Sequence, residues 1–393
     1  MDEVKVAVWD CDRFKSPGPD GVNLRFIKEF CLLLKEDIMC FIMEFHRNGK
    51  LVRGINTTFI ALIPKVENPQ KLNDFRPISL VGSMYKILAK VLANRLRMVV
   101  GKVISETQTT FVKDRHILDG VLIANEVVDE ACKLKKDLLL FKVDFEKTHD
   151  SVDWNYLDIV MGKMAFPILW QKWIKECVSN ASILVNGSPT DEFPLGRGLR
   201  QGDPLSPFLF LLAVEGLNIM MSAMVNQNLF EGYKVGSNNS MVVLDLQFAD
   251  DTLLLGVQSW ANVRALRAVL VLFEEMSGLK VNFHKILLVG VNISNSWLIK
   301  AASILNCRVG HVSFLYLGLS IGGNPRRLAF WDLVLRTIKS RLSGWKSPFL
   351  SFSGRLTLCC VEKFTRLVGI RFVLERSLEG WVLSSWGSLI YLF

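Results

Sequence analysis

The sequence has few of the residues from which metal centres and disulfide frameworks are usually built. It contains eight cysteines and five histidines in 393 residues, with no C-x-x-C pair and no histidine at metal-ligand spacing. Neither a structural zinc site nor a disulfide-stapled fold is indicated, and a reducing compartment fits this cysteine usage best.

Signals for secretion or membrane insertion are also lacking. The N-terminus has neither the basic start nor the apolar run of a secretory signal, and two apolar uncharged stretches cover residues 204–214 and 380–393. Both are shorter than the roughly twenty residues that span a bilayer. We therefore expect an intracellular protein, in the cytoplasm or the nucleus, without a transmembrane helix or a membrane partner.

The composition is that of a globular protein, with its positive charge concentrated near one end. Hydrophobic residues make up 50% and charged residues 22% of a chain long enough for two or three subdomains. Most of the formal net charge of +9 falls within residues 323–372. This window contains ten Lys or Arg and only two acidic residues, Asp332 and Glu362. Such a basic segment is typical of a polyanion partner, although a solvated helix face is the alternative.

Hydrophobic periodicity predicts an α+β fold rather than a regularly alternating α/β sheet. We expect helices over residues 23–48, 79–100, 117–136, 153–163, 168–179, 208–224 and 261–277. Strands are expected over residues 57–63, 138–144, 182–186 and 279–283, with a hairpin over 242–256. Residues 16–21 and 64–77 should be loops because prolines and glycines interrupt them.

Two adjacent carboxylates, Asp250 and Asp251, lie at the tip of the apolar hairpin. Like charges in this position call for a cation, although an Asp-Asp turn between solvated strands is the alternative. The strand over residues 138–144 ends in Asp144 and can pair beside the hairpin. Three carboxylates suit a pair of Mg²⁺ ions that act on a phosphoryl group. Lys65 and Arg76 are candidates for binding a triphosphate, and surface solubility is their alternative role.

Several longer motifs occur in one order along the chain. The sequence resembles the reverse transcriptases of plant LINE-type (non-LTR) retrotransposons over roughly residues 14–358, as a truncated copy. The motifs that carry the resemblance are SPGPDG (16–21), TTFIALIPK (57–65), DFRPISL (74–80), ILDGVLIANE (117–126), FKVDFEK (141–147), LVNGSP (184–189), GLRQGDPLSP (198–207), FADD (248–251), SGLKVNFHK (277–285) and FLYLGLSIGG (314–323).

The resemblance implies a right-hand polymerase of fingers, palm and thumb, with an antiparallel ferredoxin-like palm sheet. It implies RNA-directed DNA synthesis from deoxynucleotide triphosphates on an RNA template and a DNA primer, with two Mg²⁺ ions or Mn²⁺ in their place. Residues 1–50 would lead into the fingers, residues 51–322 would form the reverse transcriptase domain, and residues 323–393 would form a basic thumb-like segment with an aberrant tail. The oligomeric state is not predicted.

The resemblance also assigns roles to individual residues. Asp144, Asp250 and Asp251 match the metal ligands, and Lys285 matches the lysine that protonates the pyrophosphate leaving group. Tyr316, Leu317 and Gly318 match the primer grip. The nucleotide-binding positions are matched by Lys65, Arg76, Phe145, His149, Gln201 and Gly202.

The chain departs from the family pattern at several positions. Thr148-His149 replaces Ala-Tyr, whose aromatic ring is the steric gate against a ribose 2′-hydroxyl, and Ala165, Pro167 and Ile286 replace two glycines and a serine. The endonuclease expected before the motifs and the zinc-binding and RNase H-like regions expected after them are not recognised. A catalytically decayed relic that still binds nucleic acid is therefore the alternative function. A metal-dependent nuclease ranks last because only His149 is near the carboxylates in sequence.

Overall fold

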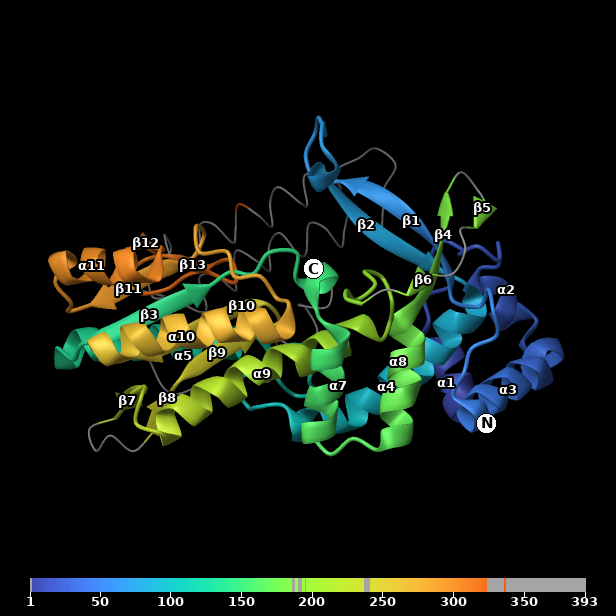
Figure 1. The fold of residues 1–393 in the computed structure, drawn as a ribbon, viewed down its shortest axis with the longest axis horizontal. Helices are drawn as coiled ribbons and strands as arrows, with labels where there is room; N and C mark the ends of the chain where they lie inside the picture. Colours follow the sequence, from blue (N-terminus) through green and yellow to red (C-terminus); the bar gives the residue numbers. More distant parts are fainter. Residues whose placement is uncertain are drawn as a thin grey trace, which may run out of the picture. The chain divides into compact units, whose positions relative to one another are not determined.

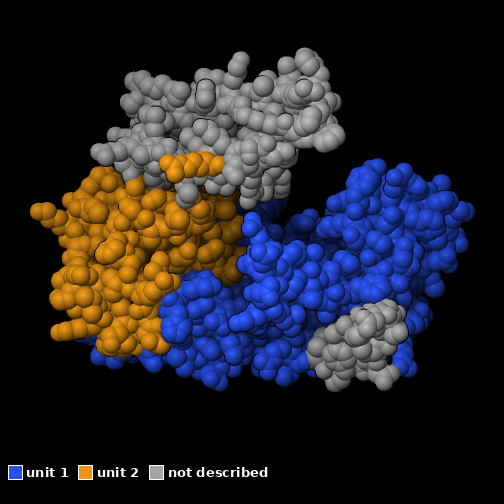
Figure 2. Space-filling model, turned by 90° about the horizontal axis from the view of Figure 1, so that it is seen from above, with its two compact units in different colours: residues 1–115, 143–231, 260–285 blue, residues 116–142, 232–259, 286–393 orange. Residues whose placement is uncertain are grey.

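The computed structural model describes residues 2–185, 188–189, 193–194, 196–236, 241–323 and 336, and side chains are not described between 179 and 195. These residues fold into two compact units (Figure 2), each built from several chain segments. Unit 1 consists of residues 1–115, 143–231 and 260–285, and unit 2 of residues 116–142, 232–259 and 286–393. The predicted basic thumb lies almost entirely outside the described residues, so it stays a prediction, as do the predicted boundaries at residues 50 and 322.

Unit 1 begins with three helices (Figure 1): α1 (Asp2–Asp10), α2 (Leu24–Glu29) and α3 (Cys31–Asn48). The helix predicted over residues 23–48 is interrupted at Phe30, which ends α2 and precedes α3. Gly49 ends α3 with a φ of 66°, as its position predicted. Helix α1 was not predicted, although the spacing of its buried Val4, Ala7 and Val8 is helical. The loop predicted over residues 16–21 is confirmed.

A small sheet follows in unit 1. Strands β1 (Thr57–Pro64) and β2 (Phe75–Val81) are antiparallel, and β4 (Asn180–Val185) pairs parallel with β1. The short strands β5 (Ser188–Pro189) and β6 (Phe193–Pro194) pair with β4, and a 3₁₀ turn, η1 (Leu72–Asp74), precedes β2. The prediction of a loop up to residue 77 and of a helix from residue 79 was therefore wrong at these positions. Cross-strand pairing outweighed the two prolines, and Arg76 lies on a strand opposite Ile63.

The core of unit 1 is helical. It contains α4 (Ser83–Val103), α6 (Thr148–Ser151), α7 (Trp154–Lys163), α8 (Ile168–Ser179), α9 (Ser206–Asn226) and α10 (Trp260–Ser277). Helix α9 packs against α4, α7 and α10 (Figure 1). Helix α9 is long and apolar enough to cross a membrane, and a helix of this kind was not predicted from the sequence. However, 67% of its most apolar window is buried inside the structure, which is typical of a core helix.

Unit 2 is built around a five-stranded sheet in the order β12-β11-β3-β10-β9. The strands are β3 (Leu138–Val143), β9 (Asp245–Phe248), β10 (Asp251–Gly256), β11 (Leu287–Val291) and β12 (Arg308–Val309). The pairs β9–β10 and β3–β11 are antiparallel, and a short parallel pair joins β11 to β12. Helix α5 (Ile117–Leu134) buries Val121, Val128 and neighbouring side chains in the same core as Leu140 and Leu253.

Among the described residues of unit 2, the remaining elements are α11 (Asn295–Leu305) and two small hairpins. One hairpin pairs β7 (Tyr233–Val235) with β8 (Met241–Val243), and the other pairs β13 (Leu315–Tyr316) with β14 (Leu319–Ser320). The strand predicted over residues 279–283 is reduced to a single bridge between Phe145 and Val281. The sheet strand is β11 instead, a few residues later. The α+β class is confirmed.

Candidate active site

The predicted acidic hairpin tip is a tight turn between β9 and β10. Phe248 ends β9 and pairs with Asp251, the first residue of β10, while Ala249 adopts a left-handed φ of 53°. Asp250 is exposed at this turn. Lys142 on β3, the strand next to β10, places its Nζ 3.7 Å from Oδ1 of Asp251. A cation therefore does face one of the two carboxylates, that of Asp251, but it comes from a neighbouring strand.

Asp144 follows immediately on the last residue of β3. Its backbone carbonyl accepts a hydrogen bond from Asn282 N at 2.8 Å, and Lys285 Nζ lies 3.7 Å from its Oδ2. The structure thus brings together Asp144 and Lys285, which are 141 positions apart in the chain. The Oδ2 atom is buried and has no hydrogen-bond partner among the described residues. An oxygen in this state favours binding to a cation.

The predicted nucleotide-binding residues Gln201 and Gly202 lie in the loop before α9. Ser79 N on β2 donates a 2.8 Å hydrogen bond to Gln201 O. Gly202 has a φ of 102°, and a Cβ atom at this position would lie 3.2 Å from the carbonyl oxygen of Ser79. Glycine is therefore required for the backbone conformation and for the close approach to β2.

His149 and Phe145 occupy different environments in unit 1. His149 stacks on Phe210 of α9, with ring centroids 5.0 Å apart and ring planes inclined by 15°, and its carbonyl accepts a 2.5 Å hydrogen bond from Leu199 N. The ring of Phe145 is buried edge-on against Phe273. The loop that carries Gln201 is thus tied by its backbone to His149, whereas a nucleotide contact by Phe145 stays a prediction.

Lys65 and Arg76 lie on the β1–β2 hairpin. Lys65 N donates to Asp74 O at 2.7 Å, and Lys65 Nζ donates to Asn73 O at 3.2 Å. Asp74 accepts hydrogen bonds from the backbone N–H groups of Lys71 and Gln70, which lower the pKa of its carboxyl group. Arg76 is exposed on β2. The hairpin therefore holds both basic residues in one element, and a triphosphate contact by either residue stays a prediction.

The predicted primer grip forms the β13–β14 hairpin of unit 2. Leu317 and Gly318 form its turn with φ values of 50° and 79°. Tyr316 is buried, and its hydroxyl lies 3.2 Å from Leu246 O and 3.4 Å from Asp251 O. Burial raises the pKa of Tyr316, so the hydroxyl keeps the proton that it donates. Tyr316 thus attaches the hairpin to strands β9 and β10.

Comparison with known proteins decides the family. The sequence profile of the family described as "Reverse transcriptase (RNA-dependent DNA polymerase)" matches residues 63–321, which is more than half of the chain. The chain belongs to the reverse transcriptase family. The family match agrees with the α+β class of right-hand polymerases.

Two relatives of this reverse transcriptase come from mobile elements. The "Transposon TX1 uncharacterized 149 kDa protein" of Xenopus laevis is 28% identical over 361 residues, 90% of this chain and 27% of that protein. The Pol polyprotein of the type-2 retrotransposable element R2DM of Drosophila melanogaster is 26% identical over 318 residues, 80% of this chain and 28% of that protein. The chain spans about a quarter of the length of these relatives.

A solved structure of telomerase from Candida albicans is similar as well, with a TM-score of 0.47 and 12% identity. That likeness covers 87% of this chain and 63% of the telomerase chain.

The carboxylates of the reverse transcriptase suit the divalent cations that the family uses. Among the described residues, no three Asp, Glu, His or Cys side chains lie close enough together to hold a metal ion. The chemistry of the individual groups nevertheless fits, because Asp144 has a buried oxygen without a hydrogen bond and because Asp144 and Asp251 each face an ammonium group at 3.7 Å.

Two further residues of the reverse transcriptase site were not predicted. Lys142 contacts Asp251, and its Nζ also donates to Leu315 O at 3.1 Å, so it links the β9–β10 hairpin to the β13–β14 hairpin. Its position two residues before Asp144 places it on the same face of the strand, which is the signal that could have found it. Ser79 contacts the Gln201 loop through its backbone N–H, so its side chain gave no signal in the sequence.

Proposed function

We propose that this chain is an RNA-directed DNA polymerase that adds deoxynucleotides to a DNA primer on an RNA template. The observation that carries the proposal is the strand order, in which β3 leads directly into Asp144 and the neighbouring β10 begins at Asp251. In the reaction, the primer 3′-oxygen forms a bond to the α-phosphorus while the bond to pyrophosphate breaks. The proton of the 3′-hydroxyl is lost, and the pyrophosphate oxygen gains one.

Each predicted residue has a part in this reaction. Asp144, Asp250 and Asp251 would hold two Mg²⁺ ions, or Mn²⁺, which when bound stabilise the charge on the attacking and leaving oxygens. Lys285 would protonate the leaving pyrophosphate, and its ammonium group is already next to Asp144.

The other predicted residues bind and orient. Lys65 and Arg76 would neutralise the triphosphate. Gln201, Gly202, Phe145 and His149 would pack against the nucleotide and the template base, and residues 316–318 would position the primer end.

Primer extension with an Asp250→Asn variant tests the proposal. The substitution keeps the shape of an exposed turn residue and removes the charge, so extension on an RNA template with Mg²⁺ should fall by at least about a hundredfold. Asp129→Asn is the matched control, because Asp129 is an exposed carboxylate of the same unit whose partner is Lys133. The control should extend primers like the parent chain.

The alternative function predicts a different outcome of the same experiment. If neither the parent chain nor the Asp250→Asn variant extends a primer while both bind RNA, the chain is a catalytically decayed relic that keeps the fold. An Asp250→Asn variant that extends as well as the parent chain would contradict the proposed role of the carboxylates.

The residue at the steric gate provides a second prediction. His149 is smaller and more polar than the expected tyrosine, so the parent chain should discriminate poorly against ribonucleotides. His149→Tyr should improve the ratio of deoxynucleotide to ribonucleotide incorporation by about tenfold. The measurement is single-nucleotide incorporation with each substrate in turn. Equal ratios of deoxynucleotide to ribonucleotide incorporation in the parent chain and in His149→Tyr would show that residue 149 is not a steric gate.

The source and the location of the protein are part of the same proposal. We propose a plant LINE-type element as the source, because the motifs resemble those of such elements. The proposed location is intracellular, in the cytoplasm or the nucleus. We also propose fingers and palm over residues 51–322, preceded by residues 1–50 and followed by a basic thumb over residues 323–393.

A further inference from the structure

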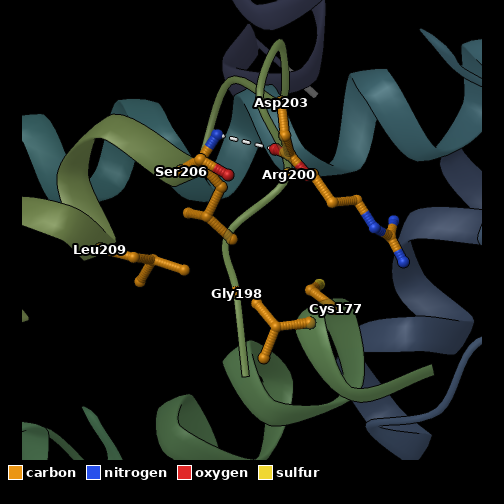
Figure 3. Close-up of a pocket in the computed structure, with 8 residues that line it drawn as sticks. Cys177, Gly198, Arg200, Asp203, Ser206 and Leu209 are labelled. Atoms are coloured by element: carbon orange, nitrogen blue, oxygen red, sulfur yellow. Dashed lines mark hydrogen bonds between the residues drawn. The ribbon is translucent and has the colours of Figure 1, made fainter. Parts of the chain in front are cut away.

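Asp203 is a buried carboxylate next to the loop residues Gln201 and Gly202, and the reaction proposed above does not use it. Its Oδ1 accepts a 2.8 Å hydrogen bond from Leu205 N at the start of α9, which Figure 3 shows as a dashed line. Its Oδ2 accepts a 2.7 Å hydrogen bond from the hydroxyl of Tyr85 on α4. Only 5% of Asp203 and 1% of Tyr85 are exposed. Both carboxylate oxygens are therefore bound inside unit 1.

Arg200 extends this contact on the other side of Gln201 and Gly202. Its Cζ lies 5.2 Å from the centroid of the Tyr85 ring, and its guanidinium donates a hydrogen bond to Asn56 Oδ1. Asn56 Nδ2 and the Tyr85 hydroxyl both lie near Cys177 O, at 3.3 and 3.2 Å. We call these four side chains, Asn56, Tyr85, Arg200 and Asp203, the buried network. It joins the loop to α4, to α8 and to the residue before β1.

The buried network holds both ends of a two-residue segment. Gln201 and Gly202 are the only residues between Arg200 and Asp203, and their backbone approaches Ser79 on β2. A cavity of about 20 Å³ next to Cys177, Arg200 and Asp203 has room for a single water molecule (Figure 3). The loop is thus closely packed, and a shift of Arg200 or Asp203 would move Gln201 and Gly202.

Stability alone does not account for a carboxylate at this position. Removing a carboxylate from water costs free energy, and apolar side chains of similar volume stabilise a protein interior as well or better. A carboxylate with two directional hydrogen bonds does fix the backbone on one side of the loop relative to α4 and α9. We therefore attribute to the network the fixed backbone position of the loop rather than a gain in stability.

We propose that Asp203, together with Tyr85 and Arg200, is a set of positioning residues that holds Gln201 and Gly202 in the conformation needed to accept the incoming nucleotide. The inference rests on the proposed polymerase function for its effect on the reaction. The effect on the loop itself does not depend on activity, so the two can be tested separately.

Each variant changes one side chain. Tyr85→Phe removes only the hydroxyl, and Asp203→Ala removes the carboxylate. Asp203→Asn is the rescue variant, because its amide can still accept from Leu205 N and can donate to Tyr85, whose own proton then goes to Cys177 O. Tyr156→Phe is the matched control, because Tyr156 is another buried tyrosine of unit 1 whose hydroxyl donates to a backbone carbonyl, that of Ala213, at 2.9 Å.

Hydrogen exchange tests the effect on the loop without requiring activity. In Tyr85→Phe and in Asp203→Ala, the amides of Ser79, Asp203 and Leu205 should exchange about tenfold faster or more, because their acceptors are no longer held in place. Asp203→Asn and Tyr156→Phe should keep the parental exchange at these amides. Unchanged exchange in both Tyr85→Phe and Asp203→Ala would overturn the proposal, even if the parent chain extends no primer.

Primer extension then tests the effect on the nucleotide. Tyr85→Phe and Asp203→Ala should raise the KM for deoxynucleotides by about ten- to a hundredfold, with a smaller change in kcat per active site. Tyr156→Phe removes a comparable buried hydrogen bond and should leave the KM unchanged. A raised KM in all three variants would indicate general loosening of unit 1 and would overturn the positioning role. No extension by the parent chain would instead refute the proposed function, and the exchange result would still decide the role of the network in the loop.

Discussion

Two buried tyrosines hold the two candidate substrate-contacting loops of this reverse transcriptase, and they do so in different ways. In unit 1, Tyr85 donates to the carboxylate of Asp203 beside the Gln201 loop. In unit 2, the Tyr316 hydroxyl lies near the backbone carbonyls of Leu246 and Asp251, next to the primer-grip turn. A carboxylate acceptor requires one particular residue, whereas a backbone carbonyl is present whatever the side chain.

This difference predicts which loop is more sensitive to substitution. The Gln201 loop depends on a matched set of side chains, and the loss of one leaves a buried charged group without its partner. The β13–β14 hairpin depends on a hydroxyl and on backbone atoms, and the loss of the hydroxyl leaves only two carbonyl groups to satisfy. We therefore expect larger effects in unit 1 for equivalent substitutions.

Glycine substitutions should give the largest contrast. Gly202→Ala places a methyl group 3.2 Å from Ser79 O at a φ of 102°, so we expect a loss of about 2–3 kcal/mol of unfolding free energy. Gly318→Ala has a φ of 79° and no atom within 4 Å, so only backbone strain of about 1 kcal/mol is expected. Urea unfolding of both variants measures the contrast. Equal losses would mean that the close approach to β2 does not restrict the loop.

Tyr316→Phe should have an intermediate effect. The hydroxyl makes two long contacts, so its loss should cost about 1 kcal/mol of unfolding free energy and should weaken use of the primer end rather than of the nucleotide. The measurement is the KM for primer-template beside the KM for deoxynucleotides, with the parent chain as reference. A change in the deoxynucleotide KM alone would contradict the assignment of this hairpin to the primer.

The smallest expected effect is a difference in pH dependence. Burial raises the pKa of Asp203, against the opposing influence of Arg200, Leu205 N, Tyr85 and Lys86, and Cys177 also faces the group. The folded state therefore binds the proton more strongly than the unfolded state. The resulting stabilisation is complete below the ordinary pKa of an aspartate and is lost as the pH rises through the raised value.

The Asp203→Asn variant cannot lose this proton, which makes it the reference. The stability of the parent chain relative to this variant should fall as the pH is raised from about 4 towards 7, as measured by urea unfolding. The hydroxyl of Tyr316 lies within hydrogen-bonding distance of two backbone carbonyls, which do not titrate, so Tyr316→Phe should show a smaller change relative to the parent chain over the same range. A stability difference between the parent chain and Asp203→Asn that stays constant with pH would mean that Asp203 keeps one protonation state throughout.

Much of the fold could be predicted from hydrophobic spacing. The helices α4, α5, α7, α8, α9 and α10 and the strands β1, β3, β9 and β10 lie close to their predicted positions. Strands β3, β9 and β10 are mostly buried, whereas β1 buries only Thr58. The errors fall where long-range contacts decided the conformation. Residues 75–81 form β2 because they pair with β1, and residues 279–283 form no strand because β11 takes the position beside β3.

The candidate site was predictable in its residues but not in its connections. The motifs indicated Asp144, Asp250 and Lys285, and the structure places Lys285 beside Asp144. The cation facing Asp251, by contrast, comes from Lys142 on the neighbouring strand, and strand order cannot be read from a single sequence. The buried network was missed for the same reason, because Asn56, Tyr85 and Asp203 carry no local pattern that predicts their contact.

The discontinuity of the two units limits how the protein can be shortened. The chain passes from one unit to the other after residues 115, 142, 231, 259 and 285, so no single cut separates them. A stop codon after residue 285 would remove β11 and leave one side of β3 without a partner, while a start after residue 115 would remove α4 and with it Tyr85. Fragments that end at residue 285 or begin after residue 115 should therefore yield insoluble or unfolded products, and a useful expression library should keep residues 2–323 intact.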